Sequence, residues 1–360
     1  MNEKFIWFPD ENQLYSHEYG TQSIPPLHSF NKTLGFTFTM DAGEHKLTLD
    51  TTDNTRNNKG NNINWPFSPL IELNESDKAY KSENTDEIPW VTITISSGNL
   101  IISGSKEKPV NFYLNNEIFL FNYKNRIELQ NSSTFTIENA GVIGISTHTN
   151  NDKNTAPIQE KPTVDISGKS CFKIQQVPEN IENFISLNCY FSITESAQAS
   201  LESHIVSIGG GSIILQDNAQ MLISSQVLDI NNKLDKQDPS LPSTNFILKA
   251  GDTSLNLNSL DGINFPLDIY REDYPKGMFN FMAKGEKNTG KVVIDVAPKD
   301  ANAYGLNTML RKNFTAINGK MVETGDQMKY FDFNYGQDTR KGNQVGTITI
   351  SLRNPLLHLS

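Results

Sequence analysis

The sequence has two cysteines, no long apolar run and few of the residues that favour helices. Cys171 and Cys189 are too few for a disulfide framework or a cysteine-rich metal cluster, and each is expected to be a small buried thiol. No stretch approaches the roughly 20 apolar residues that cross a bilayer, so we expect no membrane insertion. Asn supplies about a tenth of the 360 residues, which disfavours a helix bundle or a doubly wound α/β enzyme. The composition therefore predicts a β protein.

Positive charge is also scarce. Lys and Arg number 31 against 41 Asp and Glu, which gives a formal net charge of −10. Such a chain has no overall positive field to attract phosphates, so nucleic acid is not an expected partner. Hydrophobic residues make up 36% of the sequence, enough to build a buried core.

The first seven residues, Met1 to Trp7, contain one basic residue and lead into Pro9 and Asp10. They lack the apolar stretch of roughly 7 to 15 residues that is typical of a signal peptide. We therefore expect a protein that reaches the cell surface or the medium by a signal-independent route, or alternatively a cytoplasmic protein or the mature piece of a longer precursor.

The strongest pattern is a recurring unit of two alternating apolar strands joined by a corner of two to four small or polar residues. One such unit has an apolar face that it cannot bury alone, whereas copies stacked about 4.8 Å apart build a continuous core. Small residues let the backbone turn sharply at the corner. The unit occurs at Met40–Leu49, Ile93–Ile102, Ile127–Ile137, Ile137–Ile145, Val164–Ile174, Ile193–Leu201, Ile214–Ile223 and Ile247–Leu257.

The spacing of these units predicts the fold class. The strand-ending residues before four corners, Ile137, Ile166, Ile193 and Leu215, are separated by 166 − 137 = 29, 193 − 166 = 27 and 215 − 193 = 22 residues. We therefore predict an all-β right-handed parallel β-helix (solenoid) with terminal caps and loop insertions. An antiparallel sandwich or barrel is the alternative. Hairpin signals are few, however, and the strand–corner–strand motif has the same direction in every copy along the chain. Loops are expected at 148–162, 177–183 and 231–243.

Three regions follow from this interpretation. Residues 1–32 are expected to form an N-terminal cap that shields the first coil. The β-helix occupies residues 33–260 and carries a long insert near 51–89. Residues 261–360 are expected to form larger final coils and a C-terminal cap, with a helix at 301–312 and strands at 291–296, 329–333 and 346–352.

The runs Phe135–Ile145 and Ser212–Ile223 resemble right-handed β-helix proteins, in particular the passenger and haemagglutinin-like regions of bacterial autotransporter adhesins. The resemblance covers roughly Leu34 to Leu260 and lies in the general pattern of strands and corners, without a diagnostic motif. It implies an extended surface that binds host or cell-surface molecules. The sequence departs from that family in having neither a signal peptide nor the strand pattern of a C-terminal membrane barrel.

Two groups of residues are candidates for ligand binding. Tyr270, Arg271, Asp273 and Tyr274 combine aromatic rings, a guanidinium and a carboxylate within one polar segment that also contains Glu272. On an extended strand Arg271 and Asp273 share a face while Glu272 points away. Trp65 and Trp90 stand at opposite ends of the insert, each beside a proline, and aromatic rings near a groove are what sugar stacking needs. Packing within the protein is the competing explanation for each ring.

Other chemistry has weaker signals. Asp165, Asp217 and Asp295 lie in expected strands and could meet on stacked coils, although charged residues on an outer face are the default. The six histidines show no metal-ligand spacing, and no Gly-x-Ser-x-Gly motif occurs. We therefore expect no metal and no cofactor.

The leading hypothesis is a non-catalytic adhesive or binding protein whose β-helix surface contacts a cell-surface glycan or protein. The alternative is a polysaccharide lyase or glycoside hydrolase that acts through clustered carboxylates on one face. A structural spike or fibre component is the third hypothesis, and the sequence leaves open whether the chain forms a homo-oligomer.

Overall fold

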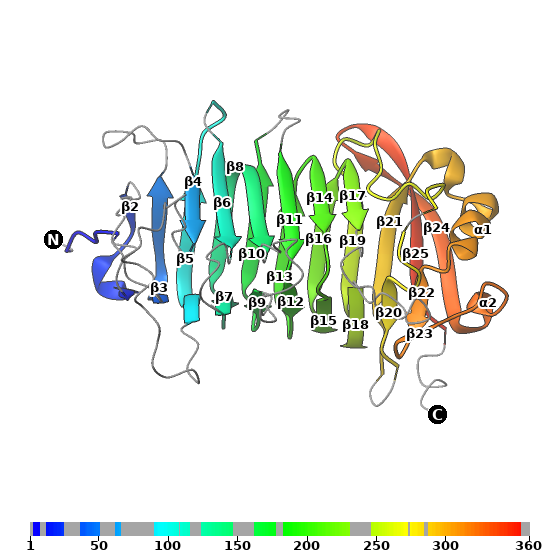
Figure 1. Ribbon diagram of the computed structural model, residues 1–360, viewed down its shortest axis with the longest axis horizontal. Coiled ribbons are helices and arrows are strands. Elements are labelled where there is room, and N and C mark those ends of the chain that lie inside the picture. The colour runs from blue at the N-terminus through cyan, green and yellow to red at the C-terminus, as the bar shows by residue number, and fades with distance from the viewer. Residues whose placement is uncertain are drawn as a thin grey trace, which may run out of the picture.

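The computed structural model describes residues 3–7, 12–24, 37–50, 62–65, 90–107, 109–115, 124–146, 162–177, 183–230, 246–272, 274–283 and 287–353. Within these residues the protein is mainly β, and nearly all strand pairs are parallel. The predicted β class is therefore confirmed. The strands lie side by side along the long axis of the molecule, with the N-terminus at one end and the C-terminal elements at the other (Figure 1).

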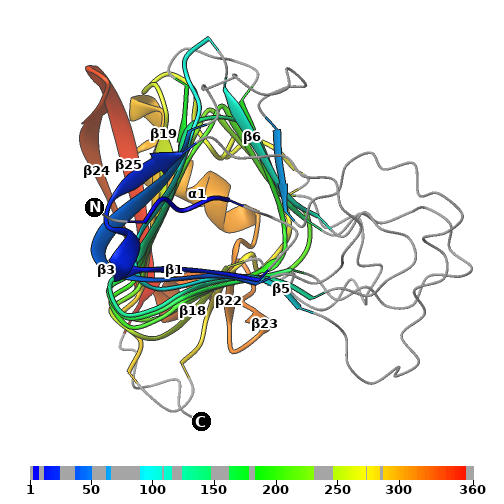
Figure 2. The same ribbon diagram turned by 90° about the vertical axis from the view of Figure 1, so that its left-hand side faces the viewer.

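The strands form three stacks in which each strand pairs with the equivalent strand of the next turn of chain, and Figure 2 shows the stacks as three sides around the core. The first stack contains β1 (Gln13–Ser16), the first part of β3 (Thr37–Asp50), the first part of β5 (Trp90–Ser103), β7 (Lys124–Leu129), β9 (Thr163–Ile166), β12 (Tyr190–Ile193), β15 (Ile213–Asp217), β18 (Phe246–Gly251), β20 (Phe279–Phe281) and β22 (Thr315–Ile317).

The second stack runs beside the first and is extended by two antiparallel strands at its C-terminal end. It contains β2 (Gln22–Ile24), the second parts of β3 and β5, the first part of β8 (Thr134–Ser146), β10 (Cys171–Gln176), β13 (Gln198–Glu202), β16 (Gln220–Ser225), β19 (Ser254–Ser259), β21 (Lys291–Val296), β25 (Asn343–Leu352) and β24 (Phe331–Arg340).

The third stack is the shortest. It contains β4 (Asn62–Trp65), β6 (Val110–Asn115), the second part of β8, β11 (Phe184–Asn188), β14 (Ile205–Ile208) and β17 (Val227–Ile230). The remaining elements are η1 (His17–Tyr19), η3 (Pro298–Asp300), α1 (Ala303–Arg311), β23 (Lys320–Met321) and α2 (Gln327–Tyr330).

Side chains at equivalent positions stack in the core from one strand to the next. In the second stack an aliphatic ladder of fully or almost fully buried residues runs through Ile137, Ile174, Leu201, Ile223, Leu257 and Ile294. Each such side chain contributes about 1.5–3 kcal/mol by leaving water. The alternating sequence pattern produces this ladder because every second residue of a strand points inward.

All eight predicted corners contain a residue with positive φ. Seven of them turn the chain from the first stack into the second, and their left-handed residues are Gly43, Gly98, Asn131, Gly168, Glu195, Asp217 and Gly251. The unit at Ile137–Ile145 differs, because it turns within β8 from the second stack into the third, at Asn139. Gly, Asn and Asp are the residues that adopt positive φ most readily, so the small and polar corner composition has a backbone cause.

The predicted spacing was right for two intervals and wrong for one. Ile193 pairs with both Ile166 and Leu215, as expected. Ile166, however, lies beside Leu129 and not Ile137, so the first spacing is 166 − 129 = 37 residues. Ile137 ends a corner unit of its own and pairs with Ile174 in the second stack.

Both ends of the stacks are covered by large side chains. At the N-terminal end Phe5 and Trp7 are buried against Phe38, with ring centroids 6.5 and 5.0 Å away. At the C-terminal end the ring of Phe331 packs edge-on against Phe281 of β20, with centroids 5.3 Å apart. The predicted helix at 301–312 is confirmed as α1, whose first and last residues lie within those bounds.

The strand predicted at 329–333 is partly wrong, because residues 327–330 form α2 and β24 begins at Phe331. The buried side chain of Gln327 fixes this helical turn by donating hydrogen bonds to the carbonyl oxygens of Leu310 and Val322. The strands predicted at 291–296 and 346–352 are confirmed as β21 and the larger part of β25.

Several predictions fall outside the described residues. They include most of the loops expected at 148–162, 177–183 and 231–243, and the insert near 51–89 apart from β4. No helix among the described residues is long and apolar enough to span a membrane.

A pair of glycine substitutions tests the stacking of the corners. Gly168 and Gly43 both have positive φ, but a Cβ at Gly168 would lie 2.3 Å from the Asn131 carbonyl oxygen, whereas a Cβ at Gly43 meets nothing within 4 Å. Gly43→Ala should lower the free energy of unfolding by about 1 kcal/mol, the cost of a left-handed alanine. Gly168→Ala should cost roughly 3 kcal/mol or more, because the preceding corner must also move. Equal losses in urea denaturation would contradict the stacked corners.

Candidate binding surface

The segment from Asp268 to Tyr274 is held by local turns. The Tyr270 amide donates to the Asp268 carboxylate at 2.9 Å, and the Arg271 amide donates to the Asp268 carbonyl at 3.0 Å. Asp commonly closes a turn in this way with its own side chain. The turn fixes the backbone that presents Tyr270 to solvent.

Tyr270 has an exposed ring and an engaged hydroxyl. Its side chain is 46% exposed, and the phenol donates to Asp300 Oδ1 at 2.6 Å. The hydrogen bond to that carboxylate is the main reason why the pKa of Tyr270 rises to about 12, and desolvation and the negative charges of Asp300 and Asp268 add to the rise. The ring is therefore held in place by one edge while its body stays in water.

Tyr304 is a second exposed ring close to this site. It is 69% exposed and lies in the first turn of α1, where Asn302 caps the helix by accepting from the Tyr304 and Gly305 amides at 2.8 and 3.2 Å. A Cβ at Gly305 would lie 1.9 Å from the Asp300 carbonyl oxygen, so the helix begins in direct contact with η3. Asp300 and Tyr304 thus occupy fixed positions on neighbouring elements.

Arg271 and Tyr274 form the inner part of the segment. The Arg271 guanidinium carbon lies 5.1 Å from the centre of the Tyr274 ring, and Nη2 lies 3.4 Å from Asp229 Oδ1 on β17. Tyr274 is buried, packs edge-on against Phe314 and accepts a hydrogen bond from the Asp268 amide at 3.2 Å. Burial is the main reason why its pKa is raised. Tyr274 therefore anchors the segment that presents Tyr270.

An ion pair between Glu272 and Lys312 ties the same segment to the end of α1. The Lys312 side chain is largely covered, while the Glu272 side chain is mostly exposed. Together with Arg271 and Asp229, this contact joins the segment to two distant parts of the chain.

The structure brings together three of the six predicted ligand-binding residues: Tyr270, Arg271 and Tyr274. Asp273 lies outside the described residues, so the expected shared face of Arg271 and Asp273 stays a prediction. Trp65 ends β4 in the third stack and Trp90 begins β5 in the first, and their side chains lie outside the described part of the structure.

Sequence reasoning missed Tyr304, Asp300 and Asn302. Asn302 directly before a helical segment is a capping signal that could have placed Tyr304 in the first turn. Nothing local, however, indicates that this turn lies beside Tyr270, since the two tyrosines are 304 − 270 = 34 residues apart.

The three strand-borne acids do not form a common site. Asp165 pairs with Arg126 at 3.1 Å in the first stack, and Asp217 accepts from the Glu195 amide at a corner. Asp295 lies in the second stack and is completely buried. Among the described residues, no group of three or more His, Cys, Asp or Glu side chains is arranged to hold a metal ion.

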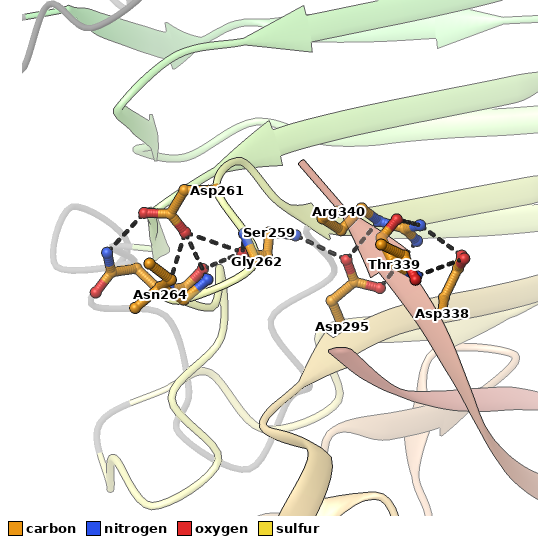
Figure 3. Close-up of polar contacts among 9 residues, drawn as sticks. Ser259, Asp261, Gly262, Asn264, Asp295, Asp338, Thr339 and Arg340 are labelled. Atoms are coloured by element: carbon orange, nitrogen blue, oxygen red, sulfur yellow. Dashed lines mark hydrogen bonds and ion pairs between the residues drawn. The ribbon is translucent and has the colours of Figure 1, made fainter. Parts of the chain in front are cut away.

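Asp295 belongs to a polar network at the C-terminal end of the second stack, shown in Figure 3. Arg340 binds it with two hydrogen bonds, from Nε to Oδ2 at 2.9 Å and from Nη2 to Oδ1 at 3.1 Å. The Ser259 amide donates to the same Oδ2 at 2.9 Å. Desolvation of the buried carboxyl raises the pKa of Asp295 against the lowering effect of these donors.

The network extends on both sides of this ion pair (Figure 3). Arg340 also donates to Asp338 on β24, and Ser259 Oγ accepts from the Gly262 amide at 2.8 Å. A Cβ at Gly262, which has positive φ, would lie 2.6 Å from the Arg340 carbonyl oxygen. The network therefore locks the loop after β19 onto the β24–β25 hairpin, which is a structural role.

Comparison with known proteins identifies no relative: neither a protein-family model, nor a curated protein, nor a solved structure matches this chain. The comparisons therefore identify no adhesin family.

The buried ion pair can be tested by removing one or both partners. Arg340→Met leaves the Asp295 carboxylate buried without its counter-charge, and should lower the free energy of unfolding by about 3–5 kcal/mol. The double variant Asp295→Leu/Arg340→Met should recover most of this loss. Arg353→Met, which removes the half-exposed pair with Asp332, should cost less than about 1 kcal/mol. A double variant as unstable as Arg340→Met would show that the loss does not come from leaving the Asp295 carboxylate buried without a counter-charge.

The cost of Arg340→Met should depend on pH. The raised pKa of Asp295 means that the folded state holds the proton more tightly than the unfolded state, where the value is about 3.9. The free energy of unfolding that depends on protonated Asp295 should therefore be fully present below pH ~4 and should decrease as the pH rises through the folded-state pKa of Asp295. Removing Arg340 makes this decrease larger. Urea denaturation from pH 4 to 7 should show a growing gap between the variant and wild type, and a constant gap would contradict the assignment.

Proposed function

We propose that the three stacks are the sides of one right-handed parallel β-helix. Two features support this. Seven successive corners carry a left-handed residue between the first and second stacks, and each strand from β9 to β16 pairs with the strand three places later in the chain. The strong preference of parallel crossovers for the right-handed sense supports the handedness.

We propose that the protein is a non-catalytic binding protein and that the surface around Tyr270 and Tyr304 binds glycans. The observation that carries the proposal is the presence of two exposed tyrosine rings on neighbouring, anchored elements. The flat face of a sugar ring packs against such aromatic faces, and the Tyr270 ring loses little freedom on binding because its hydroxyl is already held by Asp300.

Polar groups beside the rings suit the hydroxyl groups of a sugar. Asp268 is exposed beside Tyr270 and carries carboxylate oxygens that accept hydrogen bonds, whereas Asp300 is buried and already accepts from the Tyr270 phenol. An aromatic surface flanked by a few fixed polar groups is a common design for ligand sites.

The engagement of the nearby charges supports binding over catalysis. The Asp229 carboxylate is paired with Arg271, Glu272 is paired with Lys312, and Asp300 accepts from the Tyr270 phenol. A glycosidase needs two carboxyl groups free to act as acid, base or nucleophile across the scissile bond. Each of these carboxylates instead helps to hold the surface in shape.

Glycan binding should be measured with immobilised bacterial and host polysaccharides, followed by calorimetry on the tightest binder. Tyr270→Ala and Tyr304→Ala should each weaken binding about tenfold, which corresponds to ~1.4 kcal/mol of lost stacking. Tyr190→Ala is the matched control, since Tyr190 is 48% exposed but lies on β12. No glycan binding by the wild type, or equal binding by the double variant Tyr270→Ala/Tyr304→Ala, would refute the proposal.

The same polysaccharides should be incubated with the protein and assayed for new reducing ends and for unsaturated products. We expect no release, with or without calcium. Release that is abolished by Asp273→Asn would instead establish a polysaccharide-degrading enzyme and make the Tyr270 segment its active site.

A further inference from the structure

The strand β24 forms the end of the second stack. On one side it pairs along its whole length with β25, and among the described residues no strand pairs with its other side. Figure 2 shows the β24–β25 hairpin at the margin of the molecule, and in Figure 1 α1 and α2 lie beyond β24 at the C-terminal end. An open strand edge is a row of backbone donors and acceptors that is ready to pair with another chain.

The turn geometry determines which residues face this open edge. Lys341 and Gly342 both have positive φ and form a two-residue turn, so Arg340 and Asn343 flank the turn as a hydrogen-bonded pair. Backbone bonding to β25 then alternates along the strand, which leaves the amides and carbonyls of Phe333, Tyr335 and Gln337 pointing to the open side. Thr339 fits this alternation, because its own amide donates to Asp338 Oδ1 at 2.8 Å and not to β25.

The open edge is also accessible. All six residues from 334 to 339 are exposed, and Tyr335 is 54% exposed. The strand contains neither Pro nor Lys, two residues that commonly protect an edge from pairing. The strand is held rigidly at both ends, by burial of Phe331 and by the ion pair between Arg340 and Asp295. Pairing would therefore cost little further ordering.

We propose that β24 pairs antiparallel with β24 of a second copy of this chain, about a two-fold axis at Gly336. This register sets Tyr335 of each copy opposite Gln337 of the other. Each of these two equivalent pairs exchanges two backbone hydrogen bonds, so the amides and carbonyls on the open side of both residues are paired. It also places Asp332 opposite Arg340 on the same face. The second stack of one copy would then continue into that of the other.

Charge disfavours one of the two neighbouring registers. An axis at Tyr335 would set Asp332 of one copy directly against Asp338 of the other, and like charges in directly opposed positions are destabilising. With the axis at Gly336, Asp338 faces Asn334, which can donate to a carboxylate. The partner is thus identified by self-complementarity, as symmetric dimers require.

The proposal predicts a dimer that one edge substitution dissociates. Sedimentation velocity from about 1 to 100 µM should show wild-type protein moving from monomer to dimer or staying dimeric. Gln337→Pro removes an edge amide in each copy while leaving the bonds to β25, and should weaken association by about 100-fold. Gln337→Thr keeps the amide and is expected to associate like the wild type.

Charge variants test the register separately. Asp332→Lys opposes Arg340 with a like charge and should weaken association, whereas Asp326→Lys makes the same charge change at a site outside β24 and should not. Thermal unfolding checks that each variant is folded, and Asp332→Lys decides the matter if Gln337→Pro unfolds. A monomer at every concentration, or an oligomer unaffected by both Gln337→Pro and Asp332→Lys, would overturn the proposal.

Discussion

Parallel pairing in register is the constraint on which the rest of this structure depends. Because equivalent residues of successive strands lie side by side, a single inward position becomes a column of buried side chains, as in Ile174, Leu201 and Ile223. The backbone hydrogen bonds and the apolar core therefore run in the same direction and are formed together. Each turn of chain depends on its neighbours to bury its apolar face.

The same register places corner upon corner and requires the two ends to be covered. Amides at one corner donate to carbonyls at the previous one, as from Ser196 to Gly168, so a bulky residue at a corner disturbs two turns of chain. At the C-terminal end the parallel order stops at an antiparallel hairpin. The buried Asp295 carboxylate and Arg340 join that hairpin to β21.

The candidate binding surface forms where the regular stacks give way to irregular segments. Its exposed rings come from a turn after β19 and from the first turn of α1, and buried contacts such as that of Tyr274 with Phe314 hold them. The sequence predicted a polar, aromatic segment at Tyr270 but assigned its two tyrosines equal roles. Only packing against Phe314 separates the buried anchor from the exposed ring, and local sequence does not reveal that contact.

The sequence by itself determined the strands and corners, because apolar alternation and the need for positive φ are local properties of a few residues. It therefore predicted Lys291–Val296 as a strand and Ala303–Arg311 within a helix. The tertiary structure decided which strands became neighbours, such as Leu129 beside Ile166, because inserts of unequal length obscure the repeat. It also decided that Asp295, at an outward-facing strand position, is fully buried, since the residues that cover it lie 36 and 45 positions away.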